Sequence, residues 1–143
     1  MQHARRYRDL IVDQKTRQVA NAFFHISKSF PKEEKYLVTD QGRRPSRSIG
    51  AQIAEAWAKR RYEKHFISKL TDDDGEQQET QHLEDIAVDC GYLDELQRNE
   101  FISELTSVGR MLQSMIEKAD QFCGTSESCS VREIPGDYFI IEN

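Results

Sequence analysis

The chain has 143 residues, of which 37% are hydrophobic and 31% are charged, and its formal net charge is -5. This length fits one domain with a hydrophobic core, and the composition excludes fibrous and low-complexity proteins. No stretch approaches the roughly 18 apolar residues of a membrane helix. Three cysteines without CxxC spacing do not form the disulfide framework of a small secreted domain. We therefore expect a cytoplasmic, helix-rich protein with reduced thiols.

The first predicted helix lies between Tyr7 and Phe30. Its apolar face repeats every seven residues in two interleaved series, which are Val12, Val19 and Ile26, and Thr16, Phe23 and Phe30. This period is typical of a helix that packs in a bundle. Pro31 follows where the helix should end.

The second predicted helix, from about Glu34 to Arg61, is interrupted by Gly42, Pro45 and Gly50. Helical spacing nevertheless continues through Ile49, Ile53, Ala56 and Trp57. An interior proline costs a helix about 3 kcal/mol. We therefore expect a helix that is kinked near Pro45, or one that begins there with the proline in its first turn.

The third predicted helix runs from Tyr62 to Cys90, with Gly91 as a left-handed cap. Its middle contains Thr71-Asp72-Asp73-Asp74-Gly75, between apolar positions on either side. Burying an unpaired carboxylate is very unfavourable. We therefore expect either that the helix opens locally or that these carboxylates face solvent.

The fourth predicted helix has apolar residues in steps of four and three from Phe101 to Phe122, and Asp94 with Gln97 forms a capping-box pattern before it. Residues 1–124 are thus predicted to form an all-α, antiparallel up-down four-helix bundle. Residues 125–143 are predicted to form a flexible C-terminal tail, in which Tyr138-Phe139-Ile140-Ile141 could dock as a short strand or anchor.

Charge is segregated along the sequence. Gln41 to Lys69 holds eight basic and two acidic residues, a net of +6, whereas Thr71 to Glu104 holds twelve acidic residues and one arginine, a net of -11. The basic segment contains two clusters that are candidate sites for nucleic acid or a partner: Arg43, Arg44 and Arg47, and Lys59, Arg60 and Arg61.

On a continuous second helix, Arg43 and Arg61 would point the same way, because eighteen residues make five turns and span roughly 27 Å. Such a stripe could follow a phosphate backbone. The alternatives are a solvated helix face, or ion pairs with the acidic third helix of the same or a neighbouring subunit.

Glu79 and His82 match the Glu-x-x-His spacing of di-iron bundles. A di-metal site needs a second such pair and further glutamates on the facing helices, and the sequence offers no matching set. We therefore expect no metal, no cofactor and no catalytic residues, and we do not expect an enzyme.

Six short segments, in order, carry a family resemblance: Tyr7-Arg8-Asp9-Leu10, Phe30-Pro31-Lys32-Glu33-Glu34-Lys35-Tyr36, Arg43-Arg44, Ser48-Ile49, Ile53-Ala54-Glu55 and Gly91-Tyr92-Leu93. Over about Tyr7 to Cys123 the chain resembles the four-helix-bundle proteins encoded in intervening sequences of bacterial large-subunit rRNA genes. It departs from the family pattern at several positions, among them Pro45, Arg47 and the Asp72–Asp74 run.

The resemblance implies a ring of five subunits without known enzymatic activity. Similar accessory proteins of diversity-generating retroelements use basic ring surfaces to engage a reverse transcriptase and nucleic acid. Our leading hypothesis is therefore an oligomeric bundle, without a membrane partner, that presents its basic clusters to RNA, DNA or a nucleic-acid enzyme. The alternative is a structural or protein-docking scaffold with no nucleic-acid role.

Overall fold

The computed structural model describes residues 4–123, and within them the chain is helical and contains no strand. Four long helices dominate: α1 (Ile11–Ser27), α2 (Asp40–Ala58), α3 (Glu63–Asp89) and α4 (Glu95–Glu117). The shorter elements are η1 (Tyr7–Asp9), η2 (Lys32–Glu34), η3 (Lys35–Thr39, a π-helical segment) and α5 (Ala119–Phe122). The predicted all-α fold with four long helices is therefore confirmed. The predicted tail lies outside the described residues.

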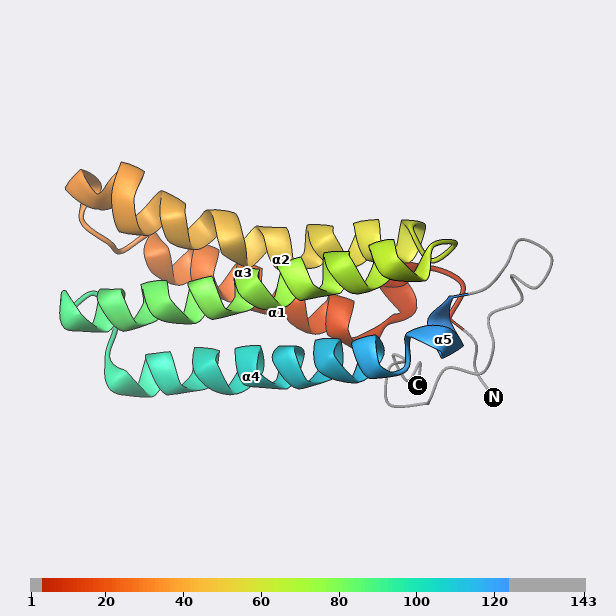
Figure 1. Cartoon of the computed structure of the whole chain (residues 1–143). Helices are drawn as coiled ribbons and strands as arrows, with labels where there is room; N and C mark the ends of the chain where they lie inside the picture. Colours follow the sequence, from red (N-terminus) through yellow and green to blue (C-terminus); the bar gives the residue numbers. More distant parts are fainter. Residues whose placement is uncertain (1–3, 124–143) are drawn as a thin grey trace.

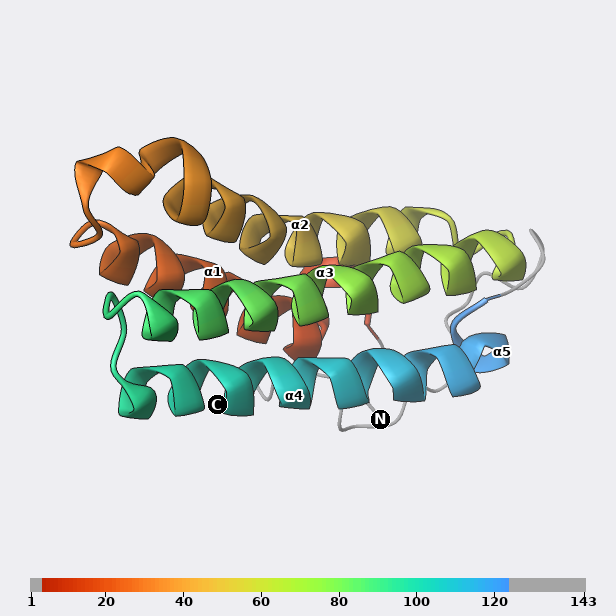
Figure 2. The ribbon, with the colours of Figure 1, turned by 60° about the vertical axis from the view of Figure 1, so that its left-hand side comes forward.

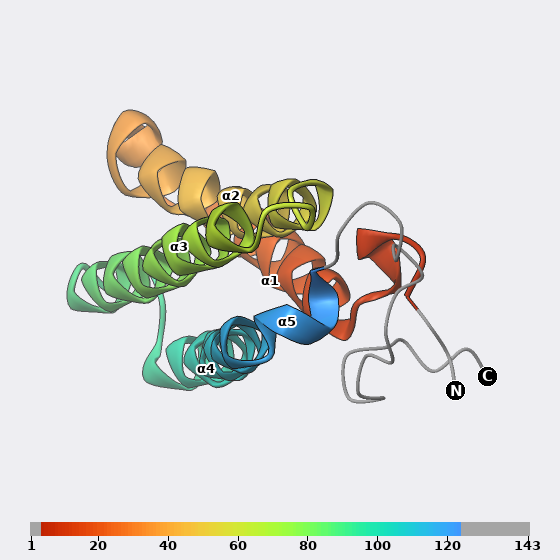
Figure 3. The ribbon, with the colours of Figure 1, turned by 45° about the vertical axis from the view of Figure 1, so that its right-hand side comes forward.

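The four long helices lie side by side, and the ribbon turns back at each connection between them (Figure 1). Contacts follow the chain order, α1 with α2, α2 with α3 and α3 with α4, and α4 closes the bundle against α1. Figures 2 and 3 show the same order from two other directions. No helix in the described part of the chain is long and apolar enough to cross a membrane.

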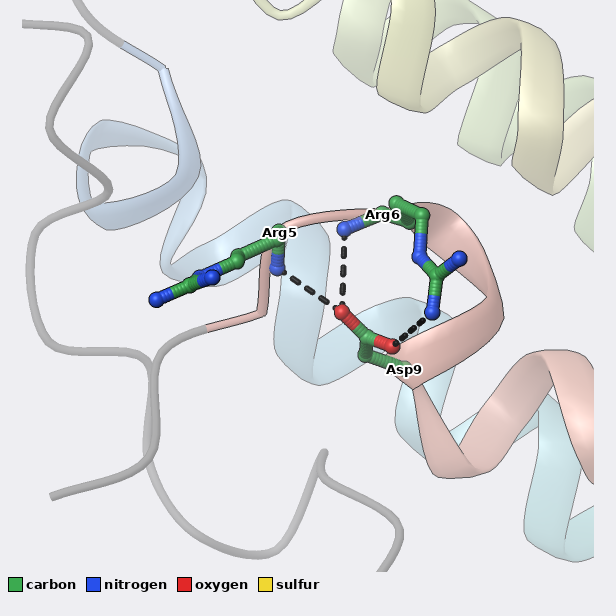
Figure 4. Close-up of polar contacts among 3 residues, drawn as sticks. All are labelled: Arg5, Arg6 and Asp9. Carbon is green, nitrogen blue, oxygen red and sulfur yellow. Dashed lines mark hydrogen bonds and ion pairs between the residues drawn. The ribbon is translucent and has the colours of Figure 1, made fainter.

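Helix α1 buries the predicted seam, since Val12, Thr16, Val19 and Phe23 are all inaccessible or nearly so. The helix begins later than predicted, because Leu10 has an extended backbone with φ -80° and ψ 132°. The preceding turn is held by Asp9, whose Oδ2 accepts hydrogen bonds from the backbone N–H groups of Arg5 at 2.9 Å and Arg6 at 3.0 Å (Figure 4). The bond from Arg5 is the largest of the effects that lower the pKa of Asp9.

The second helix differs from the prediction at both ends. The backbone break lies at Leu37, with φ -112° and ψ -105°, rather than near Pro45, and α2 begins at Asp40. Pro45 is therefore in the helix interior, where its missing N–H leaves the carbonyl of Gln41 without the usual helical bond. Helix α2 ends at Ala58, before Arg61, because Lys59 leaves the helical conformation with ψ 12°.

Helices α1 and α2 approach closely at Gly42. A Cβ atom on Gly42 would overlap the ring of Phe23, which is fully buried. That ring also makes edge-to-face contacts with Phe30 and Phe101, both with centroids 6.1 Å away. A single side chain of α1 thus joins α2, the α1–α2 connection and α4, and it fits there only because residue 42 has no side chain.

Neither alternative for the Asp72–Asp74 run is correct. Helix α3 is continuous through it, and Asp73 is fully buried, although Asp72 is exposed. The reason is the heptad spacing of α3, which carries one buried seam made of Phe66, Leu70, Asp73, Gln77, Thr80, Glu84 and Ala87. Once the apolar ends of this seam pack inward, the helix geometry takes Asp73 and Glu84 inward as well.

The ends of α3 and α4 match the sequence pattern. Gly91 has φ +76°, the N–H of Gly91 donates to the carbonyl of Val88 at 2.9 Å, and that of Tyr92 donates to the carbonyl of Ala87 at 2.8 Å. This is the predicted glycine cap. The capping box is also confirmed, because Asp94 Oδ1 accepts from the Gln97 N–H at 2.7 Å and Gln97 Oε1 accepts from the Asp94 N–H at 3.0 Å.

The two buried acids of α3 predict a pH-dependent stability. Both carboxyl oxygens of Asp73 and of Glu84 lack a hydrogen-bond partner among residues 4–123. Burial, followed by repulsion from Glu76 and Asp74, raises the pKa of Asp73 to about 9. Burial, followed by repulsion from Asp85, raises the pKa of Glu84 to about 8.

Unfolded, these acids ionise near pH 4. Between about pH 4 and pH 8 the unfolded state therefore binds fewer protons than the folded state, so the two acids lower the free energy of unfolding as the pH rises through that window. Urea denaturation at pH 5 and at pH 8 should show a smaller loss of stability in the double variant Asp73→Asn/Glu84→Gln than in the wild type. Equal losses in the two proteins would contradict this account.

Candidate nucleic-acid interface

Phe24 lies at the centre of a cationic cluster on the α1–α2 face. Its half-buried ring has the Lys28 ammonium 4.7 Å, the Arg43 guanidinium 4.8 Å and the Arg47 guanidinium 5.4 Å from its centroid. Such cation–π contacts are worth about 0.5–1 kcal/mol each at exposed sites. One aromatic ring thus holds together positive charges from two helices that would otherwise repel one another.

Arg43 is fixed in this cluster by hydrogen bonds. Its Nε donates to Ser27 Oγ at 2.8 Å, and its Nη2 lies 3.5 Å from the carbonyl oxygen of Phe24. The Ser27 hydroxyl in turn donates to that same carbonyl at 3.1 Å. Arg43 therefore pins α2 to the end of α1 and serves as a positioning residue beside the exposed Arg47.

A groove of about 610 Å³ runs along this face between α1 and α2. Its floor consists of small residues: Thr16, Ala20, Ser46 and Gly50. Its walls carry larger polar, basic and aromatic side chains: Gln14, Arg17, Gln18, Asn21, Phe24 and Arg47. Among residues 4–123, no carboxylate lines the groove, although the whole chain is acidic.

The groove is shallow because α1 and α2 are close along this stretch. A Cβ atom on Gly50 would lie 3.2 Å from Thr16 Oγ1, so the two backbones approach here as they do at Gly42. The floor hydroxyls are already engaged: Thr16 donates to the carbonyl of Asp13 at 2.7 Å, and Ser46 donates to the carbonyl of Arg43 at 2.9 Å. The groups free to meet a ligand are therefore those of the walls.

The remaining predicted residue on α2, Arg44, lines a second hollow and not the groove. This hollow, of about 910 Å³ between α2 and α3, is also lined by Arg43, Tyr36, Glu76 and Glu79. This second hollow is therefore of mixed charge. Arg47 lines both hollows, so it stands between a basic face and a mixed one.

The second predicted cluster does not join the first. Because α2 ends at Ala58, Lys59, Arg60 and Arg61 lie in the turn that leads to α3, and the predicted continuous stripe from Arg43 to Arg61 is wrong. Arg60 covers the buried Trp57, with its guanidinium 3.5 Å from the ring centroid and its Nε donating to the Trp57 carbonyl at 2.9 Å. The two clusters therefore stand at opposite ends of α2.

Sequence reasoning missed the contribution of α1. Arg17, Asn21, Phe24 and Lys28 are spaced by four, three and four residues, so they form one surface stripe on α1 that faces the Arg43–Arg47 side of α2. The spacing alone could have predicted this stripe. The stripe lies outside the basic segment from Gln41 to Lys69, so a count of charges along the sequence does not find it.

The acidic surface is partly neutralised by ion pairs between neighbouring helices. Glu55 pairs with Lys69 at 2.8 Å between α2 and α3, Lys15 with Glu104 at 3.2 Å between α1 and α4, and Arg98 with Asp85 at 3.3 Å between α4 and α3. The hydrogen bond from Lys69 is the main cause that lowers the pKa of Glu55. The carboxylates of these three pairs do not line the α1–α2 groove.

Within residues 4–123, no three His, Cys, Asp or Glu side chains gather in a way that could hold a metal ion. Glu79, one half of the Glu-x-x-His pair, lines the mixed hollow instead.

The family description of 23S rRNA-intervening sequence protein matches residues 8–114, about three quarters of the chain. The chain belongs to this family. The resemblance inferred from the sequence is thereby confirmed. The matched range contains the whole groove and both basic clusters, so the interface described above lies within the family domain.

A solved structure has the same fold. It is the crystal structure of a protein with unknown function from the S23 ribosomal protein family of Bacteroides thetaiotaomicron VPI-5482, with a TM-score of 0.67 and 26% sequence identity. The similarity covers 75% of this chain and 99% of that one. No curated protein matches the chain.

Proposed function

We propose that this family member is a non-enzymatic helical-bundle protein that binds nucleic acid through the α1–α2 face. The observation that carries the proposal is a groove that no carboxylate of residues 4–123 lines, bordered by Arg17 and Arg47 and continued by the Lys28–Phe24–Arg43 cluster. Phosphate groups are attracted by such grouped guanidinium and ammonium groups, and guanidinium groups bind them through paired hydrogen bonds.

The acidity of the whole chain does not oppose this proposal. Nucleic-acid binding depends on where the cations lie, and screening limits the reach of distant exposed charges to about 8 Å at physiological salt. On this face, Arg17 and Arg47 line the groove, and the cations of Lys28 and Arg43 contact the Phe24 ring in its wall, whereas the carboxylates that pair with lysine or arginine lie at other helix contacts.

The groove supports binding rather than catalysis. In the part of the chain that the structure describes, its lining contains no His, Cys, Asp or Glu that could act as a general base or nucleophile. Its two hydroxyl groups donate to backbone carbonyls of their own helices. A nucleic-acid enzyme such as a reverse transcriptase, which the family resemblance implies as a partner, could meet the same face through its bound nucleic acid.

The double variant Arg17→Glu/Arg47→Glu tests the proposal. It should bind RNA or DNA at least about tenfold more weakly at low salt, and its log–log salt slope should fall by about 1.4–1.8, because two phosphate contacts are lost. Fluorescence anisotropy of a labelled oligonucleotide between about 50 and 200 mM salt measures both quantities.

Arg110→Glu is the matched control, because Arg110 is exposed on α4 and does not line the groove. No wild-type binding at low salt, or an equal loss in the Arg110 variant, would contradict the proposal.

A second proposal is assembly into the ring of five subunits that the family resemblance implies. Three exposed large apolar side chains support self-association: Tyr36 and Leu37 in the α1–α2 connection, and Leu96 at the start of α4. These segments lie at the same end of the bundle (Figure 2). A scaffold without a nucleic-acid role would use this surface alone.

Light scattering should give about five times the chain mass of 16.7 kDa, and the assembly should resist high salt if apolar contacts hold it. Leu37→Asp/Leu96→Asp should release monomers, whereas Tyr62→Asp, a change at an exposed aromatic residue of the opposite end, should not. A monomeric wild type would contradict the ring. Intact rings that bind no nucleic acid would favour the scaffold.

A further inference from the structure

We propose that the α1–α2 groove is a site for single-stranded nucleic acid, in which one unstacked base enters beside Phe24 while Arg17 and Arg47 hold the flanking phosphates. This inference rests on the proposed nucleic-acid function and narrows it to one class of ligand.

The shape fits a single nucleotide. The groove of about 610 Å³ lies within the range of about 300–1,000 Å³ that is usual for small-ligand pockets. Its floor of small residues leaves room for a flat group to lie between the wall side chains. A base that is stacked and paired in a duplex cannot enter a pocket of this kind unless it is extruded, which costs unstacking energy.

The wall chemistry fits a base with its phosphates. Gln14, Gln18 and Asn21 are exposed, and their amide groups make no hydrogen bond with other described residues, so each offers both a donor and an acceptor to a base edge. Phe24 supplies an aromatic face on which a base can stack. No carboxylate of the described residues lines the groove, so none of them repels phosphate there.

The two arginines that contact Phe24 differ in their freedom to move. Arg43 is held by Ser27 and by the Phe24 carbonyl. Arg47 is exposed, its guanidinium is the farthest of the three cations from the ring, and it forms no hydrogen bond or ion pair within residues 4–123. Arg47 can therefore turn away from the ring toward the phosphate of an incoming nucleotide, while Arg43 stays against the ring.

The test compares single-stranded RNA of about 12 nucleotides, carrying one 2-aminopurine, with its duplex. The wild type should bind the single strand more tightly and quench the 2-aminopurine through stacking. Phe24→Leu keeps the apolar bulk but removes the aromatic face, so it should weaken single-strand binding by between about fivefold and a hundredfold and abolish the quenching. Duplex binding should stay unchanged.

Tyr62→Leu is the matched control, because Tyr62 is an exposed aromatic residue that lies outside this groove and outside the proposed subunit contact, and it should change neither quantity. Circular dichroism confirms that each variant is folded. Equal or tighter binding of the duplex, or wild-type quenching in Phe24→Leu, would overturn the single-strand site. If Arg17→Glu/Arg47→Glu still abolishes binding in that case, the proposed function stands and this inference alone fails.

Discussion

The fit of the Phe23 ring against Gly42 is the contact on which the rest of the molecule depends. It sets how closely α1 and α2 approach, and the same ring joins Phe30 and Phe101, so it links both neighbours of α1. The next residue on each helix lies at the surface: Phe24 follows Phe23, and Arg43 follows Gly42. A buried contact therefore places an aromatic ring and a guanidinium against each other outside, and the cationic cluster is a consequence of the core.

Much of the fold could be predicted from the sequence, because heptad spacing and capping chemistry are local. The seam of α1, the cap at Gly91 and the capping box of Asp94 follow from spacings of a few residues. The break at Leu37 could not, because no proline or glycine marks it. Asp73 was expected to face solvent or to open the helix, whereas tertiary packing of the flanking seam positions buries it despite its unfavourable desolvation.

The candidate site was only half predictable for a related reason. A charge count along the sequence finds Arg43 and Arg47 but cannot show that α1 supplies Arg17, Phe24 and Lys28 to the same face. It also groups Lys59 to Arg61 with them, although the helix ends first. The buried acids of α3 and the acid-free groove illustrate one point in common: the side of a helix on which a charge lies matters more than the net charge of its segment.

The free energy of unfolding of two glycine variants tests the central contact most directly. Gly42→Ala places a methyl group against the Phe23 ring and should cost about 1–3 kcal/mol, the usual penalty of overpacking a core. Gly75→Ala in α3 meets nothing within 4 Å and should instead gain about 0.5–1 kcal/mol from helix propensity. In urea denaturation, the free energy of unfolding should fall in Gly42→Ala and rise in Gly75→Ala. A Gly42→Ala protein as stable as the wild type would contradict the account.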